Sequence, residues 1–324
     1  MYQKQYVFED QNLFHYVCGV SDKNILELEQ LLKVEIIPRG NSLILRSNSN
    51  ENIDNALYFL EQLDIYYRNR EIEKFDLRYL FSLLRKNNFS NGSQNLKDTN
   101  AFTKARIFAN YKGKEFYAKT LNQFSYIQSI QRNPITIGVG PAGTGKTFLS
   151  VITSVKMLLN GEIERLIITR PAVEAGENLG FLPGDFIQKV DPYLRPIYDA
   201  LFDALGTEKT SQLIQLNKIE VAPLAYMRGR TLNDSLIILD EAQNCTLSQL
   251  KMFLTRIGKN SKMCICGDIT QSDLKPGLSG LEKIISILKN IQEIQIVYFS
   301  KEDIVRNPIV EKVIHAFEEY ENSQ

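Results

Sequence analysis

The sequence is poor in the residues that build many common active sites. In 324 residues it has no tryptophan, two histidines and four cysteines. His15 and His315 lie far apart and without clustered acids, which argues against zinc chemistry and against a Ser-His-Asp triad. The cysteines are too few for a disulfide framework and include no Cys-x-x-Cys pair. We therefore look for the function in other residue types.

An excess of charge of one sign is also missing, because 38 Lys and Arg residues balance 38 Asp and Glu residues. This excludes a polyanion-binding protein that works through its overall charge, although it does not exclude a local basic patch. No apolar run approaches the roughly 18 residues that span a membrane, and the N-terminus MYQKQYVFED lacks the apolar core of a signal peptide. We therefore expect a cytoplasmic protein with no membrane partner.

Length and patterning predict two folded domains joined by a polar linker. A chain of this length ordinarily forms about two domains, and a hydrophobic content of 44% is sufficient to build their cores. We place the first domain at residues 1–84, where short strand and helix patterns alternate. Residues 85–104 are polar and rich in Asn and Ser, which is typical of a linker. The second domain covers residues 105–324.

Apolar residues at strand and helix spacing predict a β-α-β-β-α module in the first domain. We expect strands at residues 16–20, 34–37 and 43–46, with a turn at 38–41 between the last two. The first expected helix follows a cap at Ser21 or Asp22, and the second carries an apolar stripe that starts at Ile53. These stripes fit the core of a small α+β domain better than they fit a binding face.

Apolar runs and helical stretches alternate from residue 119 onward, which is typical of a parallel α/β sheet. A hairpin formed by residues 105–111 and 115–118 is expected just before this region. Six strands are expected, at residues 134–139, 165–169, 219–222, 236–239, 261–266 and 293–299.

The strongest motif is Gly140-Pro-Ala-Gly-Thr-Gly-Lys-Thr147, which fits the phosphate-binding pattern G-x-x-x-x-G-K-[ST] between an expected strand and an expected helix. In such a P-loop, Lys146 reaches the β- and γ-phosphates and the Thr147 hydroxyl binds Mg²⁺. Backbone N–H groups curl around the phosphate oxygens. We therefore assign nucleotide contacts to Gly140, Pro141, Ala142, Gly143, Thr144, Gly145, Lys146 and Thr147.

A P-loop that binds a nucleotide with Mg²⁺ predicts a second element, an apolar strand that ends in an acid. The run Leu236 to Leu239, followed by Asp240 and Glu241, supplies this element. We assign Asp240 to Mg²⁺, and Glu241 to orientation or deprotonation of the attacking water. An acid pair at this place favours ATP hydrolysis over kinase or GTP-switch chemistry.

Three further positions carry weaker assignments. Gln271 follows the next strand, where a polar side chain can contact the γ-phosphate and sense its loss, or can simply form a turn. Gln123 and Tyr126 precede the P-loop. A Gln amide can pair with adenine and a Tyr ring can stack on it, although either residue can equally be an ordinary part of a helix.

Besides the P-loop, the chain contains five characteristic segments: KTLNQ (119–123), LIITRPAVEAGENLGFLPGD (166–185), PLAYMRGRTL (223–232), LDEAQNCTLSQLKMFLTRIG (239–258) and GDITQSDL (267–274). Taken together, these segments resemble the PhoH-like, phosphate-starvation-inducible ATPases, and the resemblance covers roughly residues 15–320. The resemblance implies an α/β, RecA-like P-loop core similar to the first RecA-like domain of superfamily 1 helicases, with ATP and Mg²⁺ as cofactors. It also implies that Gln123 reads adenine, that Thr169-Arg170-Pro171 faces nucleic acid and that Gln271 is the sensor.

The first domain resembles the KH-like segment that this family often carries. A KH domain clamps RNA backbone with a Gly-x-x-Gly loop. No such motif lies between residues 16–20 and Val34. RNA binding and partner docking therefore stay open as roles for this domain.

We expect the chain to need a neighbouring copy of itself. Fewer residues follow Gln271 than a second RecA-like domain would require, and phosphoryl transfer without an added Arg loses about 10³–10⁵ in rate. A homo-oligomer, expected to be a hexameric ring, would supply that Arg from the next subunit. The first candidate is Arg306, in a loop before a helix opened by Pro308, and the second candidate is the pair Arg228 and Arg230.

Two functions fit these residues. The first is a Mg²⁺-dependent ATPase ring in RNA metabolism, either helicase-like or RNA-remodelling. The alternative is an ATP-gated scaffold that turns over slowly and recruits an RNA-processing nuclease or a ribosomal partner. A small-molecule kinase is disfavoured by Glu241 and by the helicase-like segments. Stimulation of turnover by RNA separates the first two functions.

Overall fold

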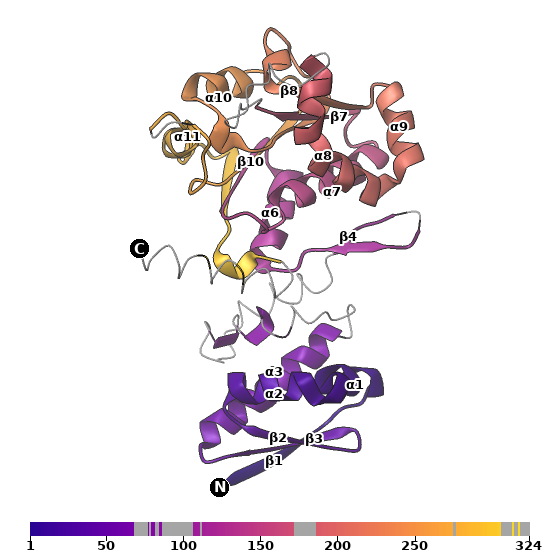
Figure 1. Cartoon of the computed structure of the whole chain (residues 1–324), viewed down its shortest axis with the longest axis vertical. Coiled ribbons are helices and arrows are strands. Elements are labelled where there is room, and N and C mark those ends of the chain that lie inside the picture. Colours follow the sequence, from indigo (N-terminus) through magenta and orange to yellow (C-terminus); the bar gives the residue numbers. More distant parts are fainter. Residues whose placement is uncertain are drawn as a thin grey trace. The chain divides into compact units, whose positions relative to one another are not determined.

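The structure, a computed structural model, divides the chain into two compact units, Met1–Ala105 and Arg106–Gln324 (Figure 1). The division lies next to the end of the segment predicted as a linker, most of which falls outside the described residues. The described residues are 1–67, 77, 79–81, 84–85, 106–110, 112–171, 186–274, 277–305, 313 and 317, with the backbone course alone for 66–67 and 186–193.

The first unit is a small α+β fold built on an antiparallel sheet. Its strands lie in the order β1-β3-β2, and both pairings are antiparallel. Fully buried side chains such as Leu28, Leu45 and Phe59 fill the space between the sheet and the helices. The elements are β1 (Tyr2–Val7), α1 (Gln11–Cys18), α2 (Lys23–Leu32), β2 (Glu35–Arg39), β3 (Ser42–Ser47) and α3 (Asn50–Tyr67).

The start of this unit differs from the prediction. Residues 16–20 are not a strand, because they form the end of α1 and the beginning of a 3₁₀ turn, Val20–Asp22. Asp22 holds the N-cap position of α2 with a φ of +56°, and its side chain makes no capping hydrogen bond to the described backbone. Strand β1 escaped prediction because most of its residues are exposed, so its sequence has no apolar alternation.

The second unit contains a six-stranded, wholly parallel sheet in the order β11-β6-β10-β9-β7-β8. The six predicted strands and the predicted hairpin, β4–β5, are all confirmed. The elements are β4 (Arg106–Ala109), β5 (Glu115–Tyr117), α6 (Leu121–Arg132), β6 (Ile135–Val139), α7 (Lys146–Leu159), β7 (Arg165–Arg170), α8 (Phe186–Leu205), α9 (Thr207–Gln215), β8 (Ile219–Pro223), β9 (Ser235–Leu239), α10 (Leu247–Leu254), β10 (Lys262–Gly267), α11 (Leu281–Leu288) and β11 (Ile294–Tyr298).

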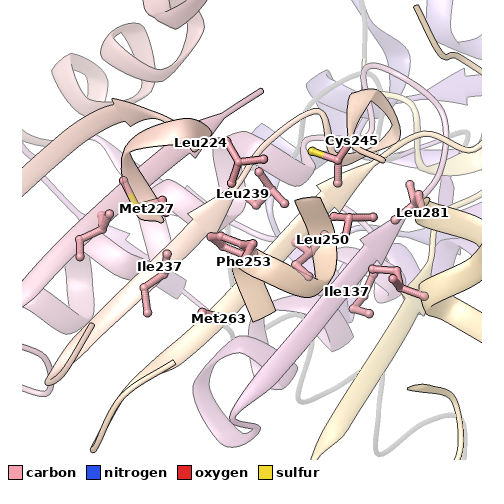
Figure 2. Close-up of a cluster of buried hydrophobic side chains, with 14 of the residues drawn as sticks. Ile137, Leu224, Met227, Ile237, Leu239, Cys245, Leu250, Phe253, Met263 and Leu281 are labelled. Atoms are coloured by element: carbon pink, nitrogen blue, oxygen red, sulfur yellow. The ribbon is translucent and has the colours of Figure 1, made fainter. Parts of the chain in front are cut away.

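Helices cover both faces of this sheet, which explains why its strands are almost continuously apolar. On one face, Leu250 and Phe253 of α10 pack with Leu281 of α11 against strand residues such as Ile137 and Ile237 (Figure 2). Helices α6 and α7 pack on strands β6 and β10. The expected RecA-like α/β core is therefore present. Among the described helices, none combines the length and apolar character needed to cross a membrane.

The strand order determines where a ligand can bind. Strand β10 lies between β6, which leads into the P-loop, and β9, which leads into Asp240. In open parallel sheets, ligands bind outside the carboxyl ends of the strands. The ends of β6, β10 and β9 therefore bring three chain segments, distant in sequence, to one place at this edge.

Candidate functional site

A cleft of about 370 Å³ opens at the carboxyl ends of these strands. Its walls come from the P-loop and from the segments that follow β7, β9 and β10. This volume lies in the range typical of small-molecule sites. The lining includes the predicted Ala142, Gly143, Gly145, Lys146, Thr147, Asp240, Glu241 and Gln271, together with Arg170, Gln243 and Asp268.

The P-loop connects the end of β6 to the first turn of α7. Gly145 immediately precedes the helix and has a φ of +82°, a conformation that a residue with a Cβ rarely adopts. This turn directs the first N–H groups of α7, and the positive end of its dipole, toward the cleft. The loop thus has the geometry of an anion-binding site.

The Lys146 ammonium lies folded back over its own loop. Its Nζ donates to the carbonyl oxygens of Gly140, at 2.7 Å, and Pro141, at 2.8 Å. The side chain is buried, and burial lowers the pKa of this ammonium group. Phosphate oxygens accept stronger hydrogen bonds from a cation than amide carbonyls do, so a nucleotide phosphate can draw this ammonium away from the loop.

Gln123 is hydrogen-bonded to the backbone of the P-loop. Helix α6 begins at Thr120, whose hydroxyl accepts a hydrogen bond from the Gln123 N–H at 3.1 Å. The Gln123 amide donates to the carbonyl oxygen of Thr144 at 3.0 Å and accepts from the N–H of Lys119 at 2.6 Å. With 3% of its surface exposed, Gln123 acts here as a brace. Its contact with adenine stays a prediction.

The adenine-stacking assignment of Tyr126 is wrong. Tyr126 is fully buried in the core beneath the sheet, and its ring occupies the space that a side chain on Gly138 would fill. Its hydroxyl lies 2.9 Å from the Cys264 sulfur and 3.1 Å from that of Cys266. The inward face of α6 places this ring against β6 and β10, so no face of the ring is exposed for adenine to stack on.

Thr147 and Asp240 form the part of the cleft that suits Mg²⁺. The Thr147 hydroxyl donates to the Asp240 carboxylate at 2.6 Å, so the two predicted ligands are neighbours. Asp240 is 4% exposed. Burial raises the pKa of its carboxyl group, while the hydrogen bond from Thr147 lowers it. A cation next to this carboxylate would compensate for the cost of burying its charge.

The oxygen atoms of Thr147 and Asp240 are also the type of ligand that Mg²⁺ prefers. Within the part of the chain that the structure describes, no three His, Cys, Asp or Glu residues gather into a metal cage. Mg²⁺ is ordinarily held by one or two protein oxygens, with phosphate oxygens and waters completing the octahedron. Thr147 and Asp240 match that arrangement and would hold Mg²⁺ together with a nucleotide.

Glu241 is held by two partners. One carboxylate oxygen accepts from Arg170 at 3.1 Å, and the other accepts from the Gln243 amide. The Gln243 carbonyl in turn accepts from the N–H of Asp268 at 3.0 Å. Gln243 thereby ties the end of β9 to the end of β10. The sequence did not point to Gln243, because an amide two residues after the acid pair has no motif of its own.

The segment after β10 contributes Asp268 and Gln271 to the cleft. Gln271 therefore lies where a sensor would be needed. Asp268 is 4% exposed, and its Oδ1 accepts from the N–H and hydroxyl of Thr270 at 2.9 and 2.7 Å. Its Oδ2 is buried and has no hydrogen-bond partner among the described residues. Such an unpaired buried oxygen costs about 1–3 kcal/mol.

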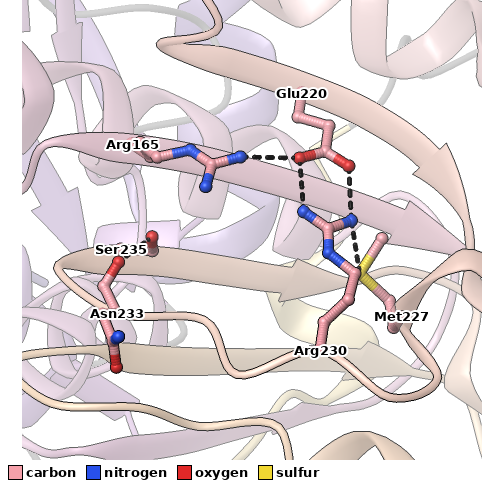
Figure 3. Close-up of polar contacts among 6 residues, drawn as sticks. All are labelled: Arg165, Glu220, Met227, Arg230, Asn233 and Ser235. Atoms are coloured by element: carbon pink, nitrogen blue, oxygen red, sulfur yellow. Dashed lines mark hydrogen bonds and ion pairs between the residues drawn. The ribbon is translucent and has the colours of Figure 1, made fainter.

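The arginines predicted as a finger for a neighbouring subunit lie in different surroundings. Arg306 and Pro308 lie outside the described residues. Arg230 is partly exposed, and its guanidinium makes two hydrogen bonds, of 2.6 and 2.8 Å, to Glu220, which also binds Arg165 (Figure 3). This bidentate pair occupies the guanidinium, and the assignment of Arg230 as a finger stays a prediction. Arg228 is exposed.

Known proteins are similar to this chain over much or most of its length. A family model described as "PhoH-like protein" matches residues 115–318, which include the entire cleft. The PhoH-like protein of Bacillus subtilis (strain 168) is 45% identical over 302 residues, which cover 93% of this chain and 92% of that protein. Protein PhoH of Escherichia coli (strain K12) is 42% identical over 203 residues, or 62% of this chain and 57% of that protein.

Asp240 leads to a prediction with a defined pH dependence. Because the pKa of the Asp240 carboxyl group is raised, the folded chain binds the carboxyl proton more tightly than the unfolded chain does. The free energy of unfolding therefore falls as pH rises from the unfolded-state pKa through the higher folded-state pKa. Asp240→Asn has no ionisable group at this position, so it does not lose stability in this pH range. At neutral pH and without nucleotide, the variant should melt at or above the wild-type temperature, whereas its affinity for Mg²⁺ with nucleotide should fall about 10- to 100-fold.

Thermal melting and Mg²⁺ titration in the presence of a nucleotide measure the two effects. The matched control is Asp234→Asn, at the opposite end of β9, which should leave the Mg²⁺ requirement unchanged. A marked loss of stability in Asp240→Asn at neutral pH would contradict the conclusion that burying the Asp240 charge is costly.

Proposed function

This chain belongs to the PhoH-like protein family, and we propose that it binds ATP with Mg²⁺ and hydrolyses the ATP in this cleft. One observation carries the proposal: Lys146, the Thr147–Asp240 pair and Glu241 line a single cleft at adjacent strand ends. These groups supply phosphate binding, a cation site and a base, which are the parts that ATP hydrolysis needs.

Binding starts with exchange of hydrogen bonds at the P-loop. The Lys146 ammonium leaves the carbonyl oxygens of Gly140 and Pro141 for phosphate oxygens, and the N–H groups at the start of α7 take further phosphate oxygens. Thr147 and Asp240 orient the cation site on the other side. Mg²⁺ held by Thr147 and Asp240 would stabilise the negative charge that develops on the phosphates as the terminal bond breaks.

Glu241 then acts on the attacking water. A carboxylate has about four lone-pair positions, and Arg170 and Gln243 use one on each oxygen. The remaining positions can accept a proton from water, with the carboxylate orientation already fixed. The same two partners restrain the base, so we propose that basal turnover is slow and rises when Arg170 is drawn elsewhere.

We propose RNA as the ligand that draws Arg170 away, in a cytoplasmic role in RNA metabolism. Arg170 ends β7 beside the cleft, and its side chain is 20% exposed. A guanidinium binds a backbone phosphate as readily as a carboxylate. An RNA phosphate near Arg170 would compete for it and free Glu241, which would couple RNA binding to ATP turnover.

Steady-state ATP hydrolysis with and without single-stranded RNA tests the proposal. We expect slow turnover alone, a clear increase with RNA, and a loss of about 100-fold or more in Lys146→Ala, because that ammonium stabilises the transferring phosphoryl group. Lys156→Ala, near the end of the same helix, is the matched control and should keep full turnover.

Full activity in Lys146→Ala would contradict the P-loop assignment. Turnover that is unaffected by RNA would contradict the RNA-coupled ATPase. It would favour the alternative, an ATP-gated scaffold that recruits a nuclease or ribosomal partner.

We also propose a homo-oligomeric ring in which a neighbour supplies Arg306 to the γ-phosphate. The proposal rests on the sequence around Arg306 and on the absence of a free arginine finger in the described cleft, where Arg170 is paired with Glu241. Arg306→Ala should keep nucleotide binding and lose about 10³–10⁵ in rate.

Mixing subunits decides whether the arginine acts between copies. Arg306→Ala and Glu241→Gln are each expected to be inactive alone. In mixed assemblies, an Arg306→Ala subunit keeps its own Glu241 and receives Arg306 from a Glu241→Gln neighbour, so partial activity should return. Mixed assemblies that form and stay inactive would contradict the proposal.

A further inference from the structure

We propose that Asp268 is a second carboxylate of the hydrolytic site, whose Oδ2 accepts a hydrogen bond from the attacking water and holds that water next to Glu241. This inference rests on the proposed ATP hydrolysis and assigns a task to a residue to which the sequence analysis gave none. Its starting point is the buried, unpartnered Oδ2 of Asp268, a residue that lines the nucleotide cleft.

The sheet places Asp268 between the phosphate site and the base. Strand β10 pairs with β6 on one side, where Gly267 is level with Val139 and the Gly140 N–H donates to the Gly267 carbonyl at 3.1 Å. On its other side β10 pairs with β9, which leads to Glu241. The first residue after β10 therefore has the P-loop on one side and the base on the other.

Two sets of hydrogen bonds fix the Asp268 carboxylate in that position. Thr270 holds Oδ1 through its N–H and its hydroxyl, which fixes the rotation of the carboxylate. Gln243 accepts from the Asp268 N–H at 3.0 Å and donates to Glu241. One amide side chain thus sets the spacing of the two carboxylates. A group held this firmly with one oxygen unused is suited to accept a donor from a ligand.

A water molecule can supply the hydrogen-bond donor that Asp268 Oδ2 lacks. It has two hydrogens, and two carboxylates at fixed spacing can each accept one of them. In the reaction, the water oxygen forms a bond to the γ-phosphorus as the bond to the bridging oxygen breaks, and that electron pair leaves on ADP. One water proton passes to Glu241. The other stays on the new phosphate, where Asp268 orients it.

Lys146 is the competing donor for Oδ2. Its ammonium is near enough to be influenced by the charge of Asp268, but its hydrogen bonds go to the carbonyl oxygens of Gly140 and Pro141 and to the Thr144 hydroxyl. If Asp268 served mainly to hold Lys146, its loss would weaken nucleotide binding. If it holds water, its loss slows the chemical step and leaves binding intact.

Asp268→Asn is the sharpest variant, because it keeps the size of the side chain. Its carbonyl oxygen can keep both hydrogen bonds from Thr270, which places the NH₂ group where Oδ2 was. A donor then faces the water in place of an acceptor. We expect kcat of the full-length chain to fall about 100-fold, as for a misplaced reactant. KM for ATP, nucleotide affinity and melting temperature should stay at the wild-type values.

Asp273→Asn is the matched control, because it alters an exposed acid of the same loop that is bonded to Asn244. It should leave kcat unchanged. Thr270→Val, at an exposed position, removes one of the two anchors of Oδ1 and should lower kcat in the same direction without changing KM.

Two outcomes would overturn the inference. The first is Asp268→Asn turnover within twofold of wild type. The second is loss of nucleotide affinity or of melting temperature in parallel with kcat, which would make Asp268 a partner of Lys146 or a structural residue. These outcomes differ from failure of the proposed function itself, in which the wild-type chain would bind nucleotide without hydrolysing it.

Discussion

The position of β10 between the P-loop strand and the acid strand is the constraint on which the cleft depends. Parallel pairing on both sides fixes the ends of β6, β10 and β9 at neighbouring places, although the three segments are far apart in sequence. The hydrogen bond between Thr147 and Asp240 then connects the two strands on either side of β10, because Thr147 lies in the helix after β6 and Asp240 follows the end of β9. Burial of a carboxylate at such a junction is costly unless a cation or a donor arrives there.

Around that frame, hydrogen bonds between protein groups fix the orientation of several side chains. Gln123 holds the back of the P-loop, Gln243 links Glu241 to the segment after β10, and Arg170 restrains Glu241 from the end of β7. Fixed donors and acceptors need no reorganisation during the reaction, which is a main source of catalytic rate. The restraint on Glu241 adds a second property. In the mechanism that we propose, a ligand that binds Arg170 would release Glu241, so the ion pair between Arg170 and Glu241 would couple that ligand to hydrolysis.

Sequence patterns predicted the elements whose signal is local. The buried parallel strands are continuous apolar runs, and the P-loop and the Asp240–Glu241 pair follow fixed spacings, so the RecA-like core and its main residues could be read directly. Strand β1 could not, because its exposed residues carry no apolar period. Tyr126 was misassigned because the sequence around a helical tyrosine does not show whether its ring faces a ligand or the core. Gln243 and Asp268 depend on how β9 and β10 pair, which is a tertiary property that residue spacing does not encode.

We propose that Glu241 is the base of an ATP-hydrolysing site and that other residues of the cleft bind the nucleotide. The most direct measurement compares nucleotide affinity and single-turnover hydrolysis of Mg²⁺-ATP in the wild-type chain and in Glu241→Gln. The account predicts equal affinity and a fall in the hydrolysis rate of about 10²–10⁴-fold, as expected for loss of a general base. A Glu241→Gln chain that hydrolyses ATP at the wild-type rate would contradict it.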